Sequence, residues 1–280
     1  MIELAEVTKK YFRVTALNRV SLNIDENKIY CLLGCNGAGK TTLFKLLAGH
    51  MKPSAGRIKI AGKELDSISV NNSVSFIQNG ASQFNLKIAD LLGIAKELNK
   101  EFDSGFAQYM VENFKLNEKK RFKDLSFGMQ TMVTTILALS NNLKIVLLDE
   151  PVLGLDAIMR NKFYNLLSES FQNYPRTIIV STHLVDEIQK IAEEVIILDK
   201  GEVILRSPAN EIEEKSYSLT GMAEEIKPFK EQLNCISEIT MGGFSTAYIF
   251  DRKISVPETV KMQPVGLQDF FIQLTGGKNE

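Results

Sequence analysis

Short apolar runs alternate with amphipathic stretches from the start of the chain to about Arg206. The run Ile29–Leu33 indicates a buried strand that enters a glycine-rich loop, and a helical pattern follows at Thr41–Ala48. Two further runs, Ile145–Leu148 and Thr177–Val180, are largely apolar, as central strands of a parallel sheet are. Strands that alternate with helices in this way predict an α/β fold built around a parallel sheet.

Two local features interrupt this alternation. Between Ile88 and Leu137 the pattern is helical with few strand signals, which predicts a helical insert over about residues 79–140. Further along, Val195–Leu198 and Glu202–Leu205 flank Asp199-Lys200-Gly201, which is a hairpin signal. Residues 1–206 are therefore expected to form one domain with a helical insert.

The chain changes character after Ser207-Pro208. Short helical and strand-like patterns alternate there, too regularly for a disordered tail, so residues 207–280 are expected to form a small α+β domain. Because no chemical motif occurs in it, a stabilising role is favoured over a regulatory domain or a dimer contact. The expected elements are helices at Asn210–Lys215, Glu224–Leu233 and Leu267–Leu274, and strands at Tyr217–Gly221, Ile236–Thr240 and Thr246–Phe250.

Composition is typical of a soluble globular protein and excludes some functions. Of the 280 residues, 44% are hydrophobic and 24% are charged, and the net charge is −1, with an isoelectric point near 6.2. This balance lacks the basic footprint of a nucleic-acid-binding surface. No apolar run approaches the ~18–20 residues that span a bilayer. Cys31, Cys35 and Cys235 fit neither a metal site nor a disulfide framework, so we expect a cytoplasmic protein.

The loop after the first buried strand has the composition of a phosphate-binding loop. Its glycines permit positive φ and close backbone approach, and the next helix adds its positive N-terminal end. Lys40 is expected to reach the β- and γ-phosphates of a nucleotide, and Thr41 to bind Mg²⁺. A simple connecting turn is the competing interpretation, which the strand–loop–helix setting disfavours. The residues expected to hold the nucleotide here are Gly34, Cys35, Asn36, Gly37, Ala38, Gly39, Lys40, Thr41 and Thr42.

Two carboxylates, Asp149 and Glu150, follow the apolar run that begins at Ile145. The carboxyl ends of parallel strands meet at one edge of a sheet, so this pair is expected beside the phosphate loop. Asp149 suits a partner of Mg²⁺, and Glu150 suits a general base that polarises the attacking water. Alone, such a pair is commonly a helix cap or a solvated edge. Together with the loop, it predicts a site that hydrolyses ATP.

The segment Leu125-Ser126-Phe127-Gly128-Met129 resembles the signature of the ATP-binding-cassette (ABC) ATPases, and the resemblance covers about residues 1–206. It implies a P-loop NTPase core with a helical insert and an antiparallel β subdomain. Ser126 and Gly128, which in this family touch the γ-phosphate, are kept, whereas Phe127 replaces a glycine and Met129 replaces a glutamine. The family pairs two cassettes head-to-tail around two ATP molecules, so Ser126 of one subunit would complete the phosphate loop of the other. Taken alone, the segment would be a helix start capped by Ser126.

The same resemblance assigns roles to other positions. Tyr11 would stack on adenine, Gln78 would contact Mg²⁺ and report to a membrane partner, and His183 would contact the γ-phosphate. The loop Gly154–Asp156 would let the two subunits sense each other's sites. In isolation these residues are an aromatic, a polar strand end, a histidine and a turn with ordinary structural roles. The catalytic candidates are Glu150, His183, Lys40 and Gln78, and the expected magnesium ligands are Thr41, Gln78 and Asp149.

By this resemblance, an ABC ATPase without a membrane span serves separate membrane-spanning permease subunits, which would hold it at the inner face of the cell membrane. The segments Glu150–Asp156 and Leu267–Phe271 and the Met-containing signature are similar to ATPases of efflux systems in Gram-positive bacteria. That similarity implies export of peptides, antibiotics or lipids. A non-transport single cassette, such as an iron–sulfur assembly ATPase, is the alternative. The second cassette is either another copy of this chain or a different chain.

Overall fold

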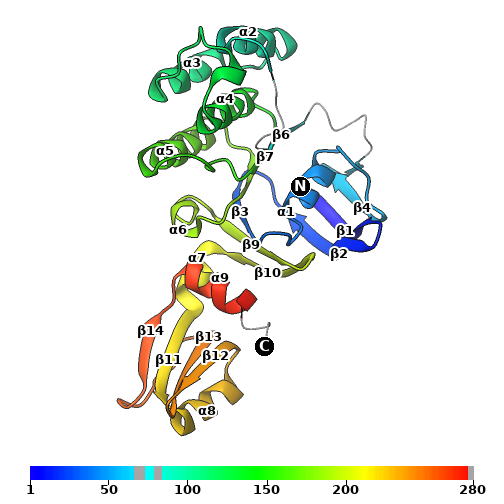
Figure 1. Ribbon diagram of the computed structural model, residues 1–280. Coiled ribbons are helices and arrows are strands. Elements are labelled where there is room, and N and C mark those ends of the chain that lie inside the picture. Colours follow the sequence, from blue (N-terminus) through cyan, green and yellow to red (C-terminus); the bar gives the residue numbers. More distant parts are fainter. Residues whose placement is uncertain (66–72, 79–83, 277–280) are drawn as a thin grey trace. The chain divides into compact units, whose positions relative to one another are not determined.

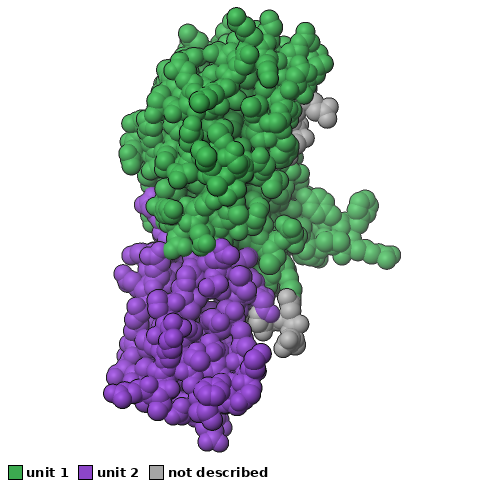
Figure 2. All heavy atoms as spheres, turned by 60° about the vertical axis from the view of Figure 1, so that its left-hand side comes forward, with its two compact units in different colours: residues 1–192, 196–205 green, residues 193–195, 206–280 purple. Residues whose placement is uncertain are grey.

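The structure is a computed structural model that describes residues 1–65, 73–78 and 84–276 (Figure 1). It divides into two compact units. The larger comprises residues 1–192 and 196–205, and the smaller comprises residues 193–195 and 206–280 (Figure 2). Within the described ranges, no helix is long and apolar enough to cross a membrane.

The central sheet has six strands in the order β10-β9-β3-β8-β7-β6. Strands β3, β8, β7 and β6 run parallel to one another. All residues of β3, β7 and β8 are buried, which explains why these segments are apolar in sequence. Their carboxyl ends share one edge, and the phosphate loop, Asp149 and Gln78 all lie there. The strands are β3 (Ile29–Leu33), β6 (Val74–Gln78), β7 (Ile145–Asp149), β8 (Thr177–Ser181), β9 (Glu194–Asp199) and β10 (Glu202–Pro208).

A second, antiparallel sheet has the order β2-β1-β4-β5. Helix α1 (Lys40–Leu47) packs between the two sheets, because its Phe44 shares one core cluster with Leu17 of β2 and Leu147 of β7. Burial of this apolar surface is the main favourable contribution to folding. The helix therefore ties the phosphate loop to both sheets. The strands are β1 (Ile2–Tyr11), β2 (Val14–Ile24), β4 (Ala55–Ile60) and β5 (Lys63–Glu64).

A group of helices follows β6, as the helical pattern predicts (Figure 1). Helix α4 packs against α3 and against strands β6 and β7. The predicted start of the insert, at residue 79, lies outside the described residues. The helices between β6 and β7 are α2 (Ile88–Leu98), α3 (Ser104–Asn113), the short 3₁₀ helix Phe122–Asp124 and α4 (Phe127–Ser140). Helix α5 (Ala157–Asn173) follows β7, and α6 (Val185–Ile188) follows β8.

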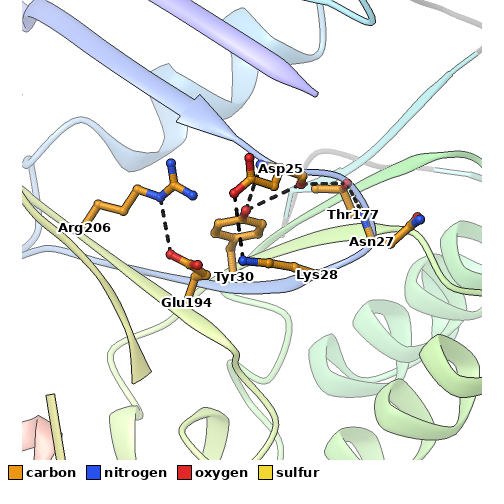
Figure 3. Close-up of polar contacts among 7 residues, drawn as sticks. All are labelled: Asp25, Asn27, Lys28, Tyr30, Thr177, Glu194 and Arg206. Carbon is orange, nitrogen blue, oxygen red and sulfur yellow. Dashed lines mark hydrogen bonds and ion pairs between the residues drawn. The ribbon is translucent and has the colours of Figure 1, made fainter. Parts of the chain in front are cut away.

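The opposite edge of the parallel sheet is tied together by polar contacts (Figure 3). The buried Tyr30 hydroxyl accepts a hydrogen bond from the Asp25 amide at 2.8 Å. The Asn27 amide donates to the Thr177 hydroxyl at 3.2 Å, and Lys28 lies 3.9 Å from the Asp25 carboxylate. These contacts fix the turn before β3 onto the start of β8. They hold β3 and β8 in the register that positions the residues at the carboxyl ends of these strands.

The smaller unit contains a third sheet, of order β12-β13-β11-β14, in which all neighbouring strands are antiparallel. Helix α8 covers one face through Ile226, which packs with Leu219 and Ile249. This is the strand order of ferredoxin-like folds. The sequence patterns do not predict β14, because its segment is short and ends in Pro264, which cannot donate to a ladder. The elements are α7 (Ala209–Lys215), β11 (Ser216–Met222), α8 (Ala223–Gln232), β12 (Cys235–Met241), β13 (Phe244–Phe250), β14 (Lys261–Pro264) and α9 (Leu267–Gly276).

Candidate nucleotide-binding site

The phosphate loop adopts a conformation that requires glycine. Gly37 and Gly39 have φ of 84° and 110°, in the left-handed region that other residues rarely adopt. A Cβ on Gly39 would lie 2.6 Å from the Ala16 carbonyl oxygen, and a Cβ on Gly34 would lie 2.5 Å from the Leu198 carbonyl oxygen. The loop therefore packs so closely against its neighbours that a side chain at Gly34 or Gly39 would disrupt its conformation.

Lys40 is almost fully buried at the first position of α1. Its ammonium donates to the carbonyl oxygens of Gly34, at 2.5 Å, and Cys35, at 3.3 Å. These bonds fold the side chain back over the loop. An ammonium held there can bind phosphate oxygens as a point charge, supported by the N-terminus of α1.

Asp149 is buried, and both of its carboxylate oxygens accept hydrogen bonds from hydroxyl groups. Thr41 donates to Oδ2 and Ser181 donates to Oδ1, each at 2.6 Å. Ser181 was missed by the sequence reasoning, which used its neighbour His183. The contact with Asp149 could not be predicted from the local sequence, because it depends on the register of β7 and β8, in which Ser181 lies opposite Asp149.

Glu150 follows at the edge of the sheet in a strained conformation. Its φ of 52° is unusual for a residue with a side chain and costs on the order of 1 kcal/mol, a strain found mainly at functional sites. Its amide donates to Ser181, both to the hydroxyl and to the carbonyl oxygen, at 3.1 Å each. Its Oε2 lies 2.9 Å from His183 Nδ1. The fold thereby brings together the expected general base and the histidine that the family resemblance assigns to the γ-phosphate.

A pocket of about 330 Å³ joins these elements at the carboxyl edge of the sheet. Gln78 ends β6 directly opposite Asp149 and lines this pocket. Ala16 of β2 and Leu153 also line it, and neither was singled out from sequence. The remaining lining residues are Cys35, Asn36, Gly37, Ala38, Gly39, Lys40, Thr41, Thr42, Asp149 and Glu150.

The signature forms the exposed start of α4, apart from this pocket. Ser126 is the N-cap, and its hydroxyl accepts a hydrogen bond from the Met129 amide at 3.4 Å. Gln130 donates to the carbonyl oxygens of Phe122 and Leu125, which fixes the chain just before the cap. Gly128 is buried, whereas Ser126, Phe127 and Met129 are exposed. No residue of this first turn lines the 330 Å³ pocket, as far as the described residues show it.

Comparison with known proteins decides the family. The chain matches the ABC transporter family model over residues 17–153. It is 32% identical to the probable sulfate/thiosulfate import ATP-binding protein CysA of Chlorella vulgaris, covering 75% of this chain and 92% of CysA. It is 29% identical to the lantibiotic transport ATP-binding protein SrtF of Streptococcus pyogenes, covering 81% of this chain and 95% of SrtF.

This chain belongs to the ABC transporter ATPase family. Among solved structures, it is similar to the ATP-binding cassette MJ0796, a dimer in a post-hydrolysis state with ADP and Pi. The identity is 26% and the TM-score 0.67, covering 75% of this chain and 99% of that one. Family membership confirms the predicted fold class and the assignment as an ATP-binding ATPase.

Tyr11, at the end of β1, is not among the residues that line the pocket. Its hydroxyl donates to Met51 Sδ at 3.0 Å, and Lys9 Nζ lies 5.5 Å from the centre of its ring. The ring is partly exposed, so its face can still receive a base. Its adenine-stacking role stays a prediction.

Magnesium fits the residues at this edge of an ABC cassette. Within the described residues no lysine or arginine pairs with the buried Asp149, whose partners are neutral hydroxyls. A buried carboxylate without a cationic partner is costly and suits a metal ion. Thr41, Asp149 and Gln78 offer only oxygen donors, as Mg²⁺ prefers, and their small number leaves room for phosphate and water ligands.

Proposed function

We propose that this chain is the ATP-hydrolysing subunit of an ABC transporter whose membrane-spanning subunits are separate chains, and that the transporter exports peptides, antibiotics or lipids. The observation that carries the hydrolytic part of the proposal is the 2.9 Å contact between Glu150 Oε2 and His183 Nδ1 beside the phosphate loop. SrtF is named for lantibiotic transport, which supports this class of cargo. CysA is also named as a transport protein, so an iron–sulfur assembly ATPase is not favoured.

The residues divide the work of hydrolysis. Lys40 and the amides of residues 35–42 bind the phosphates, and Glu150 accepts a proton from the attacking water. His183 holds the Glu150 carboxylate through the 2.9 Å contact, and by the family resemblance it would contact the terminal phosphate. Magnesium, held by Thr41, Asp149 and Gln78, would neutralise charge on the phosphate oxygens.

The working unit is a pair of cassettes. Ser126 and Gly128 of one cassette would complete the nucleotide site of a second cassette, which is either another copy of this chain or a different chain. The position of the first turn of α4 outside the pocket of its own chain supports this arrangement. Closure of the pair around ATP and reopening after hydrolysis would move the attached permease subunits. Those subunits would hold the cassettes at the inner face of the cell membrane.

The proposal is tested by isolating the tagged chain from solubilised native membranes. We expect a protein with membrane-spanning segments to co-purify, and ATP hydrolysis by the complex to rise when the exported compound is added. The Glu150→Gln chain should capture the same partner without hydrolysing ATP. Recovery of the chain with no membrane protein, under conditions that preserve ATP hydrolysis, would contradict the transport role.

A further inference from the structure

The first turn of α4 lies directly against the turn that follows Glu150. A Cβ on Gly154 would lie 2.8 Å from Phe127 Cδ1, so the Phe127 ring rests on the bare Cα of Gly154. A Cβ on Gly128 would lie 2.8 Å from the Gly154 carbonyl oxygen and 2.9 Å from Leu155 Cδ2. Two glycines therefore let the helix start and the turn approach closely, and one aromatic ring closes the gap between them.

The turn is closed onto Glu150 at its start and is anchored by Arg160 at its end. At its start, Glu150 is the last link to β7, and its carbonyl oxygen accepts from the Leu153 amide at 3.1 Å. At its end, the Leu155 carbonyl oxygen accepts from Arg160 Nη1 at 3.0 Å. Arg160 Nε in turn lies 2.8 Å from Glu187 of α6, the helix that begins just after His183. The Leu153–Glu150 hydrogen bond links the middle of the turn to the candidate base.

The middle of the turn is also the part that reaches the nucleotide pocket. Leu153 lines that pocket, and its neighbour Gly154 carries the contact with Phe127. Gly154 has φ of 81° and no side chain, so it has little resistance of its own to displacement. The bulky Phe127 ring packs against Gly154 and limits how far the turn can move.

We propose that Phe127 is a positioning residue for hydrolysis. Its ring holds residues 151–155 against the start of α4, and so keeps Leu153 and Glu150 in place at the pocket of their own chain. The inference rests on the proposed ATPase role of Glu150. This role would explain why Phe127 stands where the family signature has glycine.

The test compares Phe127→Ala, Phe127→Leu and a matched control, Tyr109→Ala, which removes an equally exposed ring from α3. Steady-state hydrolysis and the binding of a fluorescent ATP analogue are measured on the full chain. Phe127→Ala should lower kcat about tenfold, because small displacements of a catalytic group are costly, while the analogue binds within about twofold of the parent. Phe127→Leu should restore most of the loss, and Tyr109→Ala should change neither quantity.

A second arm tests the contact itself. Gly154→Ala places a methyl group against the ring and also strains a backbone with positive φ, so it should lower kcat in the parent. Phe127→Ala relieves only the contact with the ring, so Gly154→Ala should lower kcat by a smaller factor when Phe127→Ala is already present. ATP-driven dimerisation of the Glu150→Gln chain should survive Phe127→Ala, because the ring acts within its own chain.

Several results would overturn the inference. Unchanged kcat in Phe127→Ala, equal loss of analogue binding, additive effects of the two substitutions, or loss of dimerisation would each reject the positioning role. Absence of hydrolysis in the parent chain would instead refute the proposed function, and this inference with it.

Discussion

The starts of α1 and α4 are both expected to contact phosphate, yet they are built in opposite ways. Helix α1 begins after Gly39, which is left-handed and provides no side-chain cap, so its first amide groups are not covered by a capping side chain. Helix α4 begins after Ser126, whose hydroxyl already caps the Met129 amide. Around α1 stand Asp149, Glu150 and Gln78 in one pocket, whereas the first turn of α4 is exposed.

This difference indicates what each helix start needs. The α1 site contains within one chain a phosphate loop, a candidate base and candidate magnesium ligands. The α4 start offers a hydroxyl and backbone amides, and nothing in its first turn lines the described nucleotide pocket. In the described part of the chain, the α1 site therefore has no group that covers its open side, and the start of α4 has no nucleotide site beside it in its own chain. Two copies placed head-to-tail supply both needs, as a two-fold symmetric pair would.

Glu150→Gln should have the largest effect on the α1 side of this comparison. Loss of the general base should lower kcat about 10³-fold, while ATP binding is kept because the phosphate loop is intact. The measurement is hydrolysis under saturating ATP beside equilibrium binding. Glu97→Gln, an exposed carboxylate on α2, is the matched control and should match the parent. Preserved hydrolysis in Glu150→Gln would remove Glu150 from the mechanism.

Ser126→Arg should have the next largest effect, on the α4 side. The bulky cation occupies the place where Ser126 would contact the nucleotide of a second cassette, so hydrolysis at that site should fall on the order of 10²-fold, while ATP binding by the isolated chain stays within the error of the assay. Ser104→Arg, at the exposed start of α3, places the same charge at another helix N-terminus and should be neutral. If Ser126→Arg weakens binding and hydrolysis equally, the signature acts on its own chain.

The smallest expected effect is on the rate of cysteine alkylation, which should depend on whether nucleotide occupies the α1 site. Cys35 is exposed in the phosphate loop, whereas Cys31 is buried in β3. Burial, followed by the charge of Glu150, raises the pKa of the Cys31 thiol, so its reactive thiolate is scarce at neutral pH. Burial likewise raises the pKa of Cys235. Peptide mapping should find Cys35 labelled first, and saturating ATP should slow that labelling about tenfold. Labelling at an unchanged rate with ATP would place the nucleotide elsewhere.

Sequence patterns predict the local parts of this molecule well. The strand before the phosphate loop, helix α1 and the turn at 199–201 each depend on residues close together in the chain. Most elements of residues 207–280 are likewise predicted from short periodic patterns. Their physical causes are local: the apolar content of buried strands, the conformational freedom of glycine, and the chemistry of turns.

Contacts between strands lie beyond such patterns. Ser181 supports Asp149 only because β7 and β8 pair in one register, which no local pattern specifies. The left-handed Glu150 and the Phe127–Gly154 contact likewise arise from tertiary packing. Tyr11 is the converse case. The family resemblance assigns its ring to the base, which stays a prediction, and only the tertiary structure shows that its hydroxyl donates to Met51.

Mixing two inactive chains tests the head-to-tail pair most directly. Lys40→Ala removes the phosphate site of one copy, and Ser126→Arg blocks the signature of the other. A mixed pair then keeps one intact site, formed by Lys40 of the Ser126→Arg chain and Ser126 of the Lys40→Ala chain. With random pairing, an equal mixture should recover about a quarter of the parental rate, since half the pairs are mixed and each has one working site. A mixture no more active than its two components would contradict the account.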